Sequence, residues 1–151
     1  MENRKFGLGV IVCIFNRDFS KMLLLKRNKE KRKLNKADWG NAGGRVELGE
    51  RLVNACVRET KEEIGIDLNP EQLKLLDIKE TTENTIAPTV HFLQFIYATK
   101  LDKIKEITLN EESEDYAWFD LNELPERTLD SKEDLIKLSI AAKKKFLEDE
   151  N

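Results

Sequence analysis

The sequence has few of the residues that build disulfide-rich or zinc-centred folds. Its 151 residues include only two cysteines and one histidine, so neither a disulfide framework nor a Cys/His zinc cluster is expected. Both cysteines, Cys13 and Cys56, lie within apolar patterns, and we predict that they are buried free thiols. No apolar run approaches the ~20 residues that a membrane span needs, and the N-terminus has no apolar signal region. These absences predict a cytoplasmic protein with no membrane attachment.

An excess of positive charge is also missing. The 26 Lys and Arg residues are outnumbered by 29 Asp and Glu residues, for a net charge of −3. Because a nucleic-acid backbone binds a basic stripe, no stable nucleic-acid complex is expected. A small substrate with phosphate groups, whose negative charge a metal ion neutralises, remains compatible with this net charge. The composition, 40% hydrophobic and 36% charged, is typical of a globular protein, and residues 1–151 are predicted to form one domain.

The most informative segment runs from Gly43 to Ile66 and reads GGRVELGERLVNACVRETKEEIGI. Its glycines and polar residues predict a loop. From about Leu52 the apolar residues recur at helical spacing, and Gly65 is a suitable helix stop. The segment therefore predicts a glycine loop that leads into one amphipathic helix.

Three carboxylates gather on one side of this predicted helix. Glu59 and Glu63 are one turn apart and stand over each other, while Glu62 lies about 60° to the side. Like charges at this spacing destabilise a helix by a few tenths of a kcal/mol, and Arg58 can neutralise only one of them. One interpretation is an acidic surface helix that is merely solvated. The other is a site for a hard divalent cation such as Mg²⁺, which prefers oxygen ligands.

The spacing of the charged and glycine residues resembles the signature of the Nudix (MutT-like) hydrolases. Gly44 is followed after five residues by Glu50, and seven residues later by Arg58-Glu59, Glu62-Glu63 and Gly65-Ile66. Thr60 departs from the aliphatic residue that is usual there, and Ala42 replaces a proline that many relatives carry. Neither departure removes a functional group from the pattern.

The rest of the chain predicts a mixed α/β domain. The predicted strands are Leu8–Phe15 and Met22–Lys26 as a hairpin, then Leu73–Lys79, Thr89–Thr99 and Tyr116–Asp120, with polar loops at Asn28–Asp38 and Glu80–Pro88 and a final helix from Ser131 to about Glu148. The resemblance implies a more specific architecture, an α/β/α sandwich with a mixed sheet, a catalytic helix and a C-terminal helix.

The resemblance also implies a metal site and its ligands. The ion is expected to be Mg²⁺, with Mn²⁺ as the alternative. A glutamate from the acidic run at 111–115 completes the site in relatives, and Glu112 is preferred here over Glu114; a simple solvated loop is the competing interpretation of that run. The implied ligands are the backbone carbonyl of Gly43 and the carboxylates of Glu59, Glu62, Glu63 and Glu112.

Further roles are carried over from the family in the same way. Glu59, Glu62 and Arg58 are assigned as catalytic. Glu59 is the residue that orients or deprotonates water, and Arg58 bridges to Glu50 so that the glycine loop is held against the helix. Contacts with substrate phosphates are assigned to Lys26 or Arg27 and to Gly44. For two other residues the structural role is favoured over a role in reading the base: Trp39 as a core aromatic and His91 as a partly buried side chain.

The implied function is hydrolysis of a nucleoside diphosphate linked to another moiety. Neither the proline typical of ADP-ribose-cleaving relatives nor the tyrosine of dinucleoside-polyphosphate relatives occurs near Glu80–Glu83. A (deoxy)nucleoside triphosphate, cleaved to a monophosphate and pyrophosphate, is therefore the favoured substrate, and ADP-ribose or a nucleotide sugar is the alternative. A non-catalytic domain that senses a nucleotide is the alternative from another class, although all the motif glutamates are present. A homodimer is left open.

Overall fold

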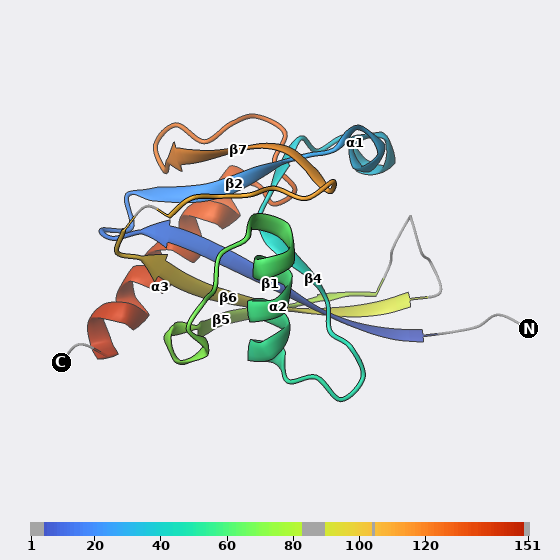
Figure 1. Ribbon diagram of the computed structural model, residues 1–151, viewed down its shortest axis with the longest axis horizontal. Coiled ribbons are helices and arrows are strands. Elements are labelled where there is room, and N and C mark those ends of the chain that lie inside the picture. The colour runs from blue at the N-terminus through green and yellow to red at the C-terminus, as the bar shows by residue number, and fades with distance from the viewer. Residues whose placement is uncertain (1–4, 83–89, 104, 150–151) are drawn as a thin grey trace, which may run out of the picture.

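The computed structural model describes residues 5–82, 90–103 and 105–149. Within them a seven-stranded mixed sheet lies between two long helices, with α2 on one face and α3 on the other (Figure 1). This arrangement confirms the predicted α/β/α sandwich. The elements are β1 (Lys5–Asn16), β2 (Lys21–Arg27), α1 (Lys29–Asn35), β3 (Trp39–Gly40), β4 (Ala42–Arg45), α2 (Leu52–Ile64), the 3-10 turn η1 (Pro70–Gln72), β5 (Lys74–Thr81), β6 (Val90–Leu101), β7 (Ser113–Asp120) and α3 (Lys132–Asp149).

Strand β1 is the centre of the sheet. It pairs in parallel with β6 along its whole length and antiparallel with β4 from Gly9 to Val12. The predicted hairpin with β2 forms, but its register is limited to Phe15 and Met22, next to the turn. Strand β2 pairs with β7 along its whole length, from Lys21 to Arg27, and with β3 at Leu25 and Lys26. The sheet therefore divides into two halves, and the space between the halves opens beside β4.

Alternation along the strands builds one core on each face of the sheet. Val10, Val12 and Ile14 pack with the buried side of α2, whereas Cys13 and Phe15 pack with α3. Strand β6 follows the predicted alternation, because its Phe95 and Tyr97 join the first core and its Ile96 joins the second. Because both faces are covered, the run from Val10 to Phe15 has almost no polar residue, as expected for a strand buried on both sides.

The prediction of a polar loop at Asn28–Asp38 is wrong, since residues 29–35 form α1. The Asn28 side chain accepts a hydrogen bond from the Lys31 backbone N–H, and Lys36 ends the helix in the left-handed conformation at φ 58°. Lysine, arginine and glutamate are good helix formers, and Asn28 is a favourable N-cap. Because so many of these residues are charged, the segment was interpreted as a solvent-exposed loop and the helix was not predicted.

The glycine loop is likewise not a loop at its start. Ala42–Arg45 is strand β4, in which Gly43 faces Ile11 and Gly44 faces Val10 of β1. A side chain on Gly43 would collide with the Val10 carbonyl oxygen, so only glycine allows this close pairing. The predicted loop at Glu80–Pro88 starts inside β5, which ends at Thr81, and its residues 83–88 lie outside the described residues.

Several local predictions are confirmed. Cys13 and Cys56 are buried free thiols, and burial raises the pKa of each thiol to about 12, so neither is a thiolate at neutral pH. The Ser131 hydroxyl accepts a hydrogen bond from the Asp134 N–H at 3.0 Å at the start of α3. No helix within the described residues is both long and apolar enough to cross a bilayer.

Thr60 is fully buried, and its hydroxyl has no hydrogen-bond partner in the described part of the chain. Thr60→Val is expected to raise the free energy of unfolding by about 1 kcal/mol, because it removes an unpaired buried hydroxyl while keeping the shape. Urea unfolding measures the change. Ser139→Ala is the matched control, since the Ser139 hydroxyl donates to the Ile136 carbonyl at 2.6 Å and its loss should destabilise. A Thr60→Val protein less stable than the parent contradicts the expectation.

Candidate metal and phosphate site

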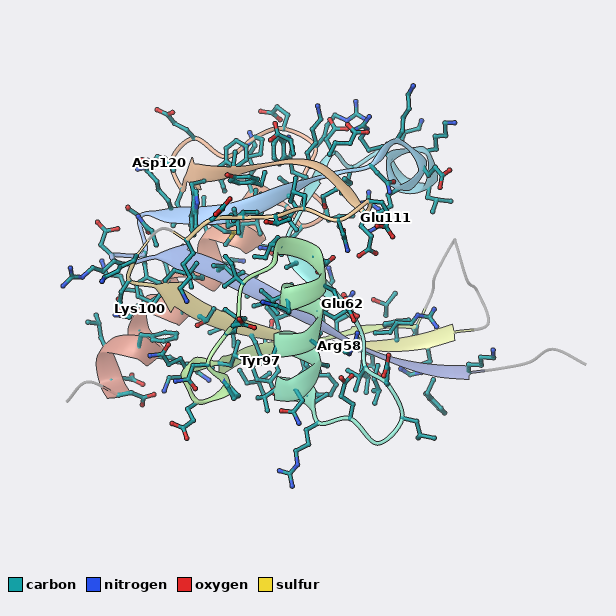
Figure 2. The ribbon with its side chains drawn as sticks, in the orientation of Figure 1. Arg58, Glu62, Tyr97, Lys100, Glu111 and Asp120 are labelled. Carbon is teal, nitrogen blue, oxygen red and sulfur yellow. The ribbon has the colours of Figure 1, made fainter. Side chains whose placement is uncertain are left out.

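Helix α2 presents its carboxylates to β4 because its apolar side is fixed against the sheet. Ala55, Cys56, Thr60 and Ile64 are buried, and Gly65 ends the helix in the left-handed conformation at φ 73°, which glycine adopts without strain. In Figure 2, Arg58 and Glu62 lie along one side of α2, and Glu111 marks the acidic loop near α1. The packing of the helix thus decides where the motif glutamates point.

Glu63 is the most buried of these glutamates, with 5% of its surface exposed. Its Oε2 accepts a hydrogen bond from the Gly43 backbone N–H at 2.9 Å, which ties α2 directly to β4. The pKa of Glu63 is raised to about 8, mainly by burial and also by the negative charges of Glu112 and Glu59, which together outweigh the hydrogen bond from Gly43. Without a cation, this carboxylate is therefore in an unfavourable place to be charged.

Glu59 lies against the backbone of Gly44. A Cβ atom on Gly44 would lie too close to the carboxyl carbon of Glu59 for a non-bonded contact, so the missing side chain is what makes room for it. The Glu59 side chain is only 12% exposed, and burial is the main cause that raises the pKa of its carboxyl group above the usual value. The two glycines of the motif therefore act differently: Gly43 allows strand pairing and Gly44 accommodates a carboxylate.

Arg58 joins the helix to the loop that precedes it. Its Nε and Nη2 bind the two carboxylate oxygens of Glu50 at 2.8 and 3.0 Å, so the predicted Arg58–Glu50 bridge is present and bidentate. Nη1 lies 3.0 Å from Glu59 Oε1 and 3.3 Å from Glu62 Oε2. The hydrogen bond from Arg58 lowers the pKa of Glu50. Arg58 thereby holds the loop in place and offsets part of the charge of the other two glutamates.

The acidic loop brings Glu112 to the same region. Its Oε1 lies 3.2 Å from Lys31 Nζ, and its charge raises the pKa of both Glu59 and Glu63. Glu114 instead pairs with Arg32 at 2.8 Å, and that hydrogen bond lowers the pKa of Glu114. The arrangement agrees with the choice of Glu112 over Glu114, although the role itself remains a prediction.

A cavity of about 370 Å³ opens between the two halves of the sheet. Gly43, Gly44 and Glu63 line it on one side. Its cationic lining comes from Arg27, Lys31 and Arg45, which suits a polyanion. Sequence reasoning proposed Lys26 or Arg27 for phosphate contacts, and of the two Arg27 lines the cavity.

Lys31 and Arg45 were missed by the sequence reasoning. The N-cap at Asn28 was the available signal for Lys31, because it begins a helix that turns this residue toward the acidic loop. Arg45 lies over the ring of Phe92, 5.6 Å from its centroid, and Phe92 also lines the cavity; no local pattern pairs these two residues.

Trp39 and His91 pack against other side chains of the fold, in agreement with the structural role favoured from the sequence. Trp39 packs edge-on against Phe119 with ring centroids 4.9 Å apart. His91 Nε2 lies 2.7 Å from Glu80 Oε2, and its ring is 5.3 Å from that of Phe6. Neither residue lines the cavity beside the glutamates.

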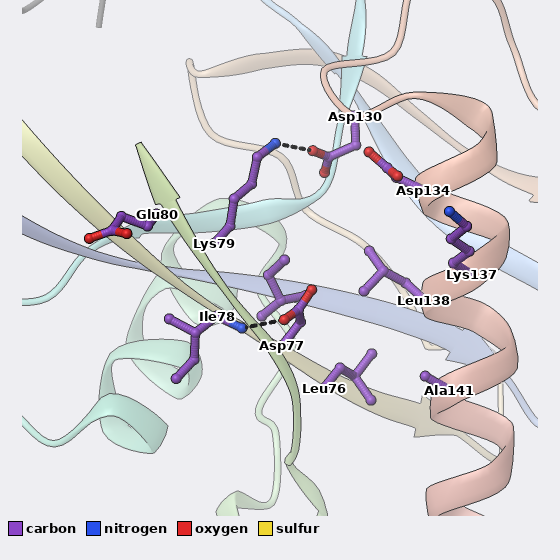
Figure 3. Close-up of a pocket in the computed structure, with 11 residues that line it drawn as sticks. Leu76, Asp77, Ile78, Lys79, Glu80, Asp130, Asp134, Lys137, Leu138 and Ala141 are labelled. Atoms are coloured by element: carbon purple, nitrogen blue, oxygen red, sulfur yellow. Dashed lines mark hydrogen bonds and ion pairs between the residues drawn. The ribbon is translucent and has the colours of Figure 1, made fainter. Parts of the chain in front are cut away.

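A second and larger cavity, of about 550 Å³, lies between β5 and α3 (Figure 3). Leu76, Ile96 and Leu138 form its apolar part, and the ion pair between Lys79 and Asp130, at 3.3 Å, stands at its rim. None of the predicted site residues lines it. Size alone would favour this cavity, but the buried carboxylates and the cationic lining of the smaller one make that the candidate site.

The donor groups fit a hard divalent cation. All are carboxylate or carbonyl oxygens, which Mg²⁺ prefers, and the space above Gly44 exists only because that residue lacks a side chain. Among the described residues, no three Asp, Glu, His or Cys side chains already converge as a set of metal ligands. Arg58 pairs with Glu59 and Glu62, and Lys31 pairs with Glu112, so these carboxylates would have to exchange partners to share a metal ion.

The free energy of unfolding should depend on pH because the folded protein disfavours the charged form of Glu63. Its pKa rises from 4.5 to about 8 on folding, so the folded state favours the protonated form. Its contribution to stability is full below about pH 4.5 and is lost as the pH rises toward about 8. In EDTA, the free energy of unfolding should therefore fall across this window in the parent and fall less in Glu63→Gln. Urea unfolding at several pH values measures both slopes, and equal slopes contradict the assignment.

Comparisons with known proteins identify a family that the chain matches and several proteins to which it is similar. Residues 5–138 match the family model described as the NUDIX domain. The chain is 32% identical over 136 residues to the nucleoside triphosphatase NudI of Escherichia coli O17:K52:H18, which covers 79% of this chain and 92% of that protein. It is 35% identical over 79 residues to the dihydroneopterin triphosphate diphosphatase of Escherichia coli K12, which covers 52% of this chain and 49% of that protein. The chain therefore spans about half the length of this second relative.

Solved structures resemble the chain over most of its length. A MutT NUDIX hydrolase from Burkholderia pseudomallei superposes with a TM-score of 0.68 at 26% identity and covers 91% of this chain and 95% of that chain. The dihydroneopterin triphosphate pyrophosphohydrolase of E. coli superposes with a TM-score of 0.60 at 26% identity, covering 76% of this chain and 81% of that chain.

Proposed function

The chain belongs to the Nudix hydrolase family, and from this premise we propose that it hydrolyses a (deoxy)nucleoside triphosphate to a monophosphate and pyrophosphate with Mg²⁺ or Mn²⁺. The observation that carries the proposal is the cavity between the half-sheets, where Arg27, Lys31 and Arg45 lie beside the buried carboxylate of Glu63. Two of the relatives are named for triphosphate substrates, which supports the choice of substrate. We also propose that residues 1–151 act as one Nudix domain.

The metal ion would be held by the carbonyl oxygen of Gly43 and the carboxylates of Glu59, Glu62, Glu63 and Glu112. When bound, it supplies charge neutralisation and polarises a phosphoryl oxygen, which is the main requirement for attack on a polyanion. The Gly43 N–H orients Glu63 through its 2.9 Å hydrogen bond. Arg58 keeps the loop that contains Glu50 against α2.

In the proposed reaction, Glu59 is the general base. Water attacks a phosphorus atom on one side of the oxygen that joins the first two phosphates, and Glu59 accepts the proton of that water. The P–O bond breaks and leaves the monophosphate and pyrophosphate. The raised pKa of Glu59, caused mainly by burial, suits a base because it brings the proton affinity of the carboxylate closer to that needed at neutral pH. Arg27 and Gly44 contact the phosphate chain in this scheme.

The proposal is tested with a panel of substrates in Mg²⁺: the common nucleoside and deoxynucleoside triphosphates, ADP-ribose and UDP-glucose. Release of the nucleoside monophosphate, the product common to all these substrates, is compared between the parent, Glu63→Gln and the control Glu71→Gln, which changes an exposed glutamate at η1. Release from a triphosphate by the parent and the control, but not by Glu63→Gln, is the expected result. Equal rates in parent and Glu63→Gln reject the catalytic assignment. Turnover of ADP-ribose or UDP-glucose alone moves the substrate to that class, and binding without turnover favours a nucleotide sensor.

A further inference from the structure

Helix α1 is attached through its N-cap and first turn to the acidic run at 111–114, which ends in the first residues of β7. The Asn28 backbone N–H donates to the Glu112 carbonyl at 3.1 Å, and the Asn28 side chain donates to the Glu111 carbonyl at 3.1 Å. Arg32 pairs with Glu114 at 2.8 Å. These contacts hold the backbone of α1 next to the loop whether or not Lys31 is paired.

Lys31 is in a different position from Arg32, because it faces both the loop and the cavity. Its Nζ lies 3.2 Å from Glu112 Oε1, and the residue lines the cavity together with Gly43, Gly44 and Glu63. Its positive charge acts on Glu63 by lowering the pKa of that carboxyl group. Lys31 thus contacts one of the predicted metal carboxylates and also lines the space proposed for the phosphate chain.

The pair between Lys31 and Glu112 is suited to exchange of partners. Both side chains are partly exposed, at 36% and 41%, and a pair of this kind is weak. A lysine ammonium is a point charge on a flexible chain with three donors, so it can move from one anion to another nearby. A divalent ion that takes the Glu112 carboxylate would repel the ammonium and leave it facing the cavity.

We propose that Lys31 binds the phosphate chain of the substrate and that Glu112 holds it until a divalent ion occupies that carboxylate. This inference rests on the proposed function, because it uses the same site. It couples the two ligands: metal binding releases the cation that the polyphosphate needs, so the metal promotes substrate binding through a residue of α1 as well as through its own charge.

The coupling predicts that removal of the Lys31 charge changes the affinity for the metal ion and the affinity for the phosphate chain in opposite directions. Lys31→Met removes the competitor for Glu112, so Mn²⁺ alone should bind the substrate-free protein about two- to fivefold more tightly. In saturating Mn²⁺, the same variant should bind methylenediphosphonate about tenfold more weakly or worse, because a charge-assisted contact is lost. Lys31→Arg keeps the charge and should restore much of the phosphonate affinity. A variant that merely loosened α1 would displace Glu112 and weaken Mn²⁺ binding instead.

Isothermal titration calorimetry measures both affinities in the parent, in both Lys31 variants and in Lys33→Met, the control on an exposed residue of the same helix. Unchanged or weaker Mn²⁺ binding by Lys31→Met overturns the inference, and so does unchanged phosphonate binding. These binding measurements test the role of Lys31 independently of whether the protein hydrolyses nucleotides. If Lys31→Met shows both shifts yet the parent hydrolyses no nucleotide, the proposed reaction fails and the role of Lys31 stands. If the parent hydrolyses nucleotides and Lys31→Met shows neither shift, the reverse holds.

Discussion

Replacement of Glu59 by Gln is expected to lower kcat for triphosphate hydrolysis by about 10²- to 10⁴-fold, the usual contribution of a general base. The amide keeps the shape of the carboxyl group but cannot accept the proton of the attacking water. Its folded stability should change little, because the side chain stays in the space above Gly44 and Arg58 retains its two contacts with Glu50. Steady-state kinetics in Mg²⁺ and urea unfolding measure the two quantities.

Glu50→Gln is the control variant against which the activity of Glu59→Gln is compared. Glu50 binds Arg58 through both carboxylate oxygens and is not among the proposed metal ligands, so its loss should loosen the loop and reduce activity by less than the loss of Glu59 does. A Glu59→Gln enzyme within a few-fold of the parent would remove Glu59 as the base. The assignment would then pass to another of the motif glutamates.

Alanine at the two neighbouring glycines is expected to have opposite effects. In Gly44→Ala the new Cβ meets the Glu59 carboxyl group, which is the mobile end of a side chain and can move away. Stability should therefore change little, while activity falls by about 10²-fold or more because the base is displaced. In Gly43→Ala the Cβ meets the backbone of Val10 and Ile11, which cannot yield without opening the β1–β4 pairing. The expected cost is about 1–3 kcal/mol of stability.

Thermal or urea unfolding and kinetics on the same two proteins separate these outcomes. Gly49→Ala is a useful third variant, because no atom lies within 4 Å of its new Cβ, whereas its φ of +85° disfavours any side chain. It should lose about 1 kcal/mol from backbone strain alone and keep its activity. A Gly44→Ala protein that is fully active would show that Glu59 does not need its present position.

Sequence patterns predicted the elements whose residues repeat at a fixed period. The helix from Leu52 to Ile64 and strand β6 were found because apolar residues recur at helical or alternating spacing. Helix α1 was missed because seven residues rich in charge have no apolar face to repeat, and its formation depends on the cap at Asn28 and on contacts with residues 111–114. Such contacts are far apart in sequence, so no local signal contains them.

By itself, the sequence predicted most of the acidic part of the candidate site: Glu59, Glu62 and Glu63, the arginine that bridges to Glu50 and the two glycines, at the spacing of one family, together with Glu112 from the acidic run. Only the tertiary structure decided which of these groups share a cavity. The divergence of β2 from β1 brings Arg27 and Lys31 opposite Gly43 and Glu63 and turns Lys26 elsewhere. The physical reason is that spacing along a helix fixes which side chains share a face, whereas the distance between two elements is set by packing across the whole sheet.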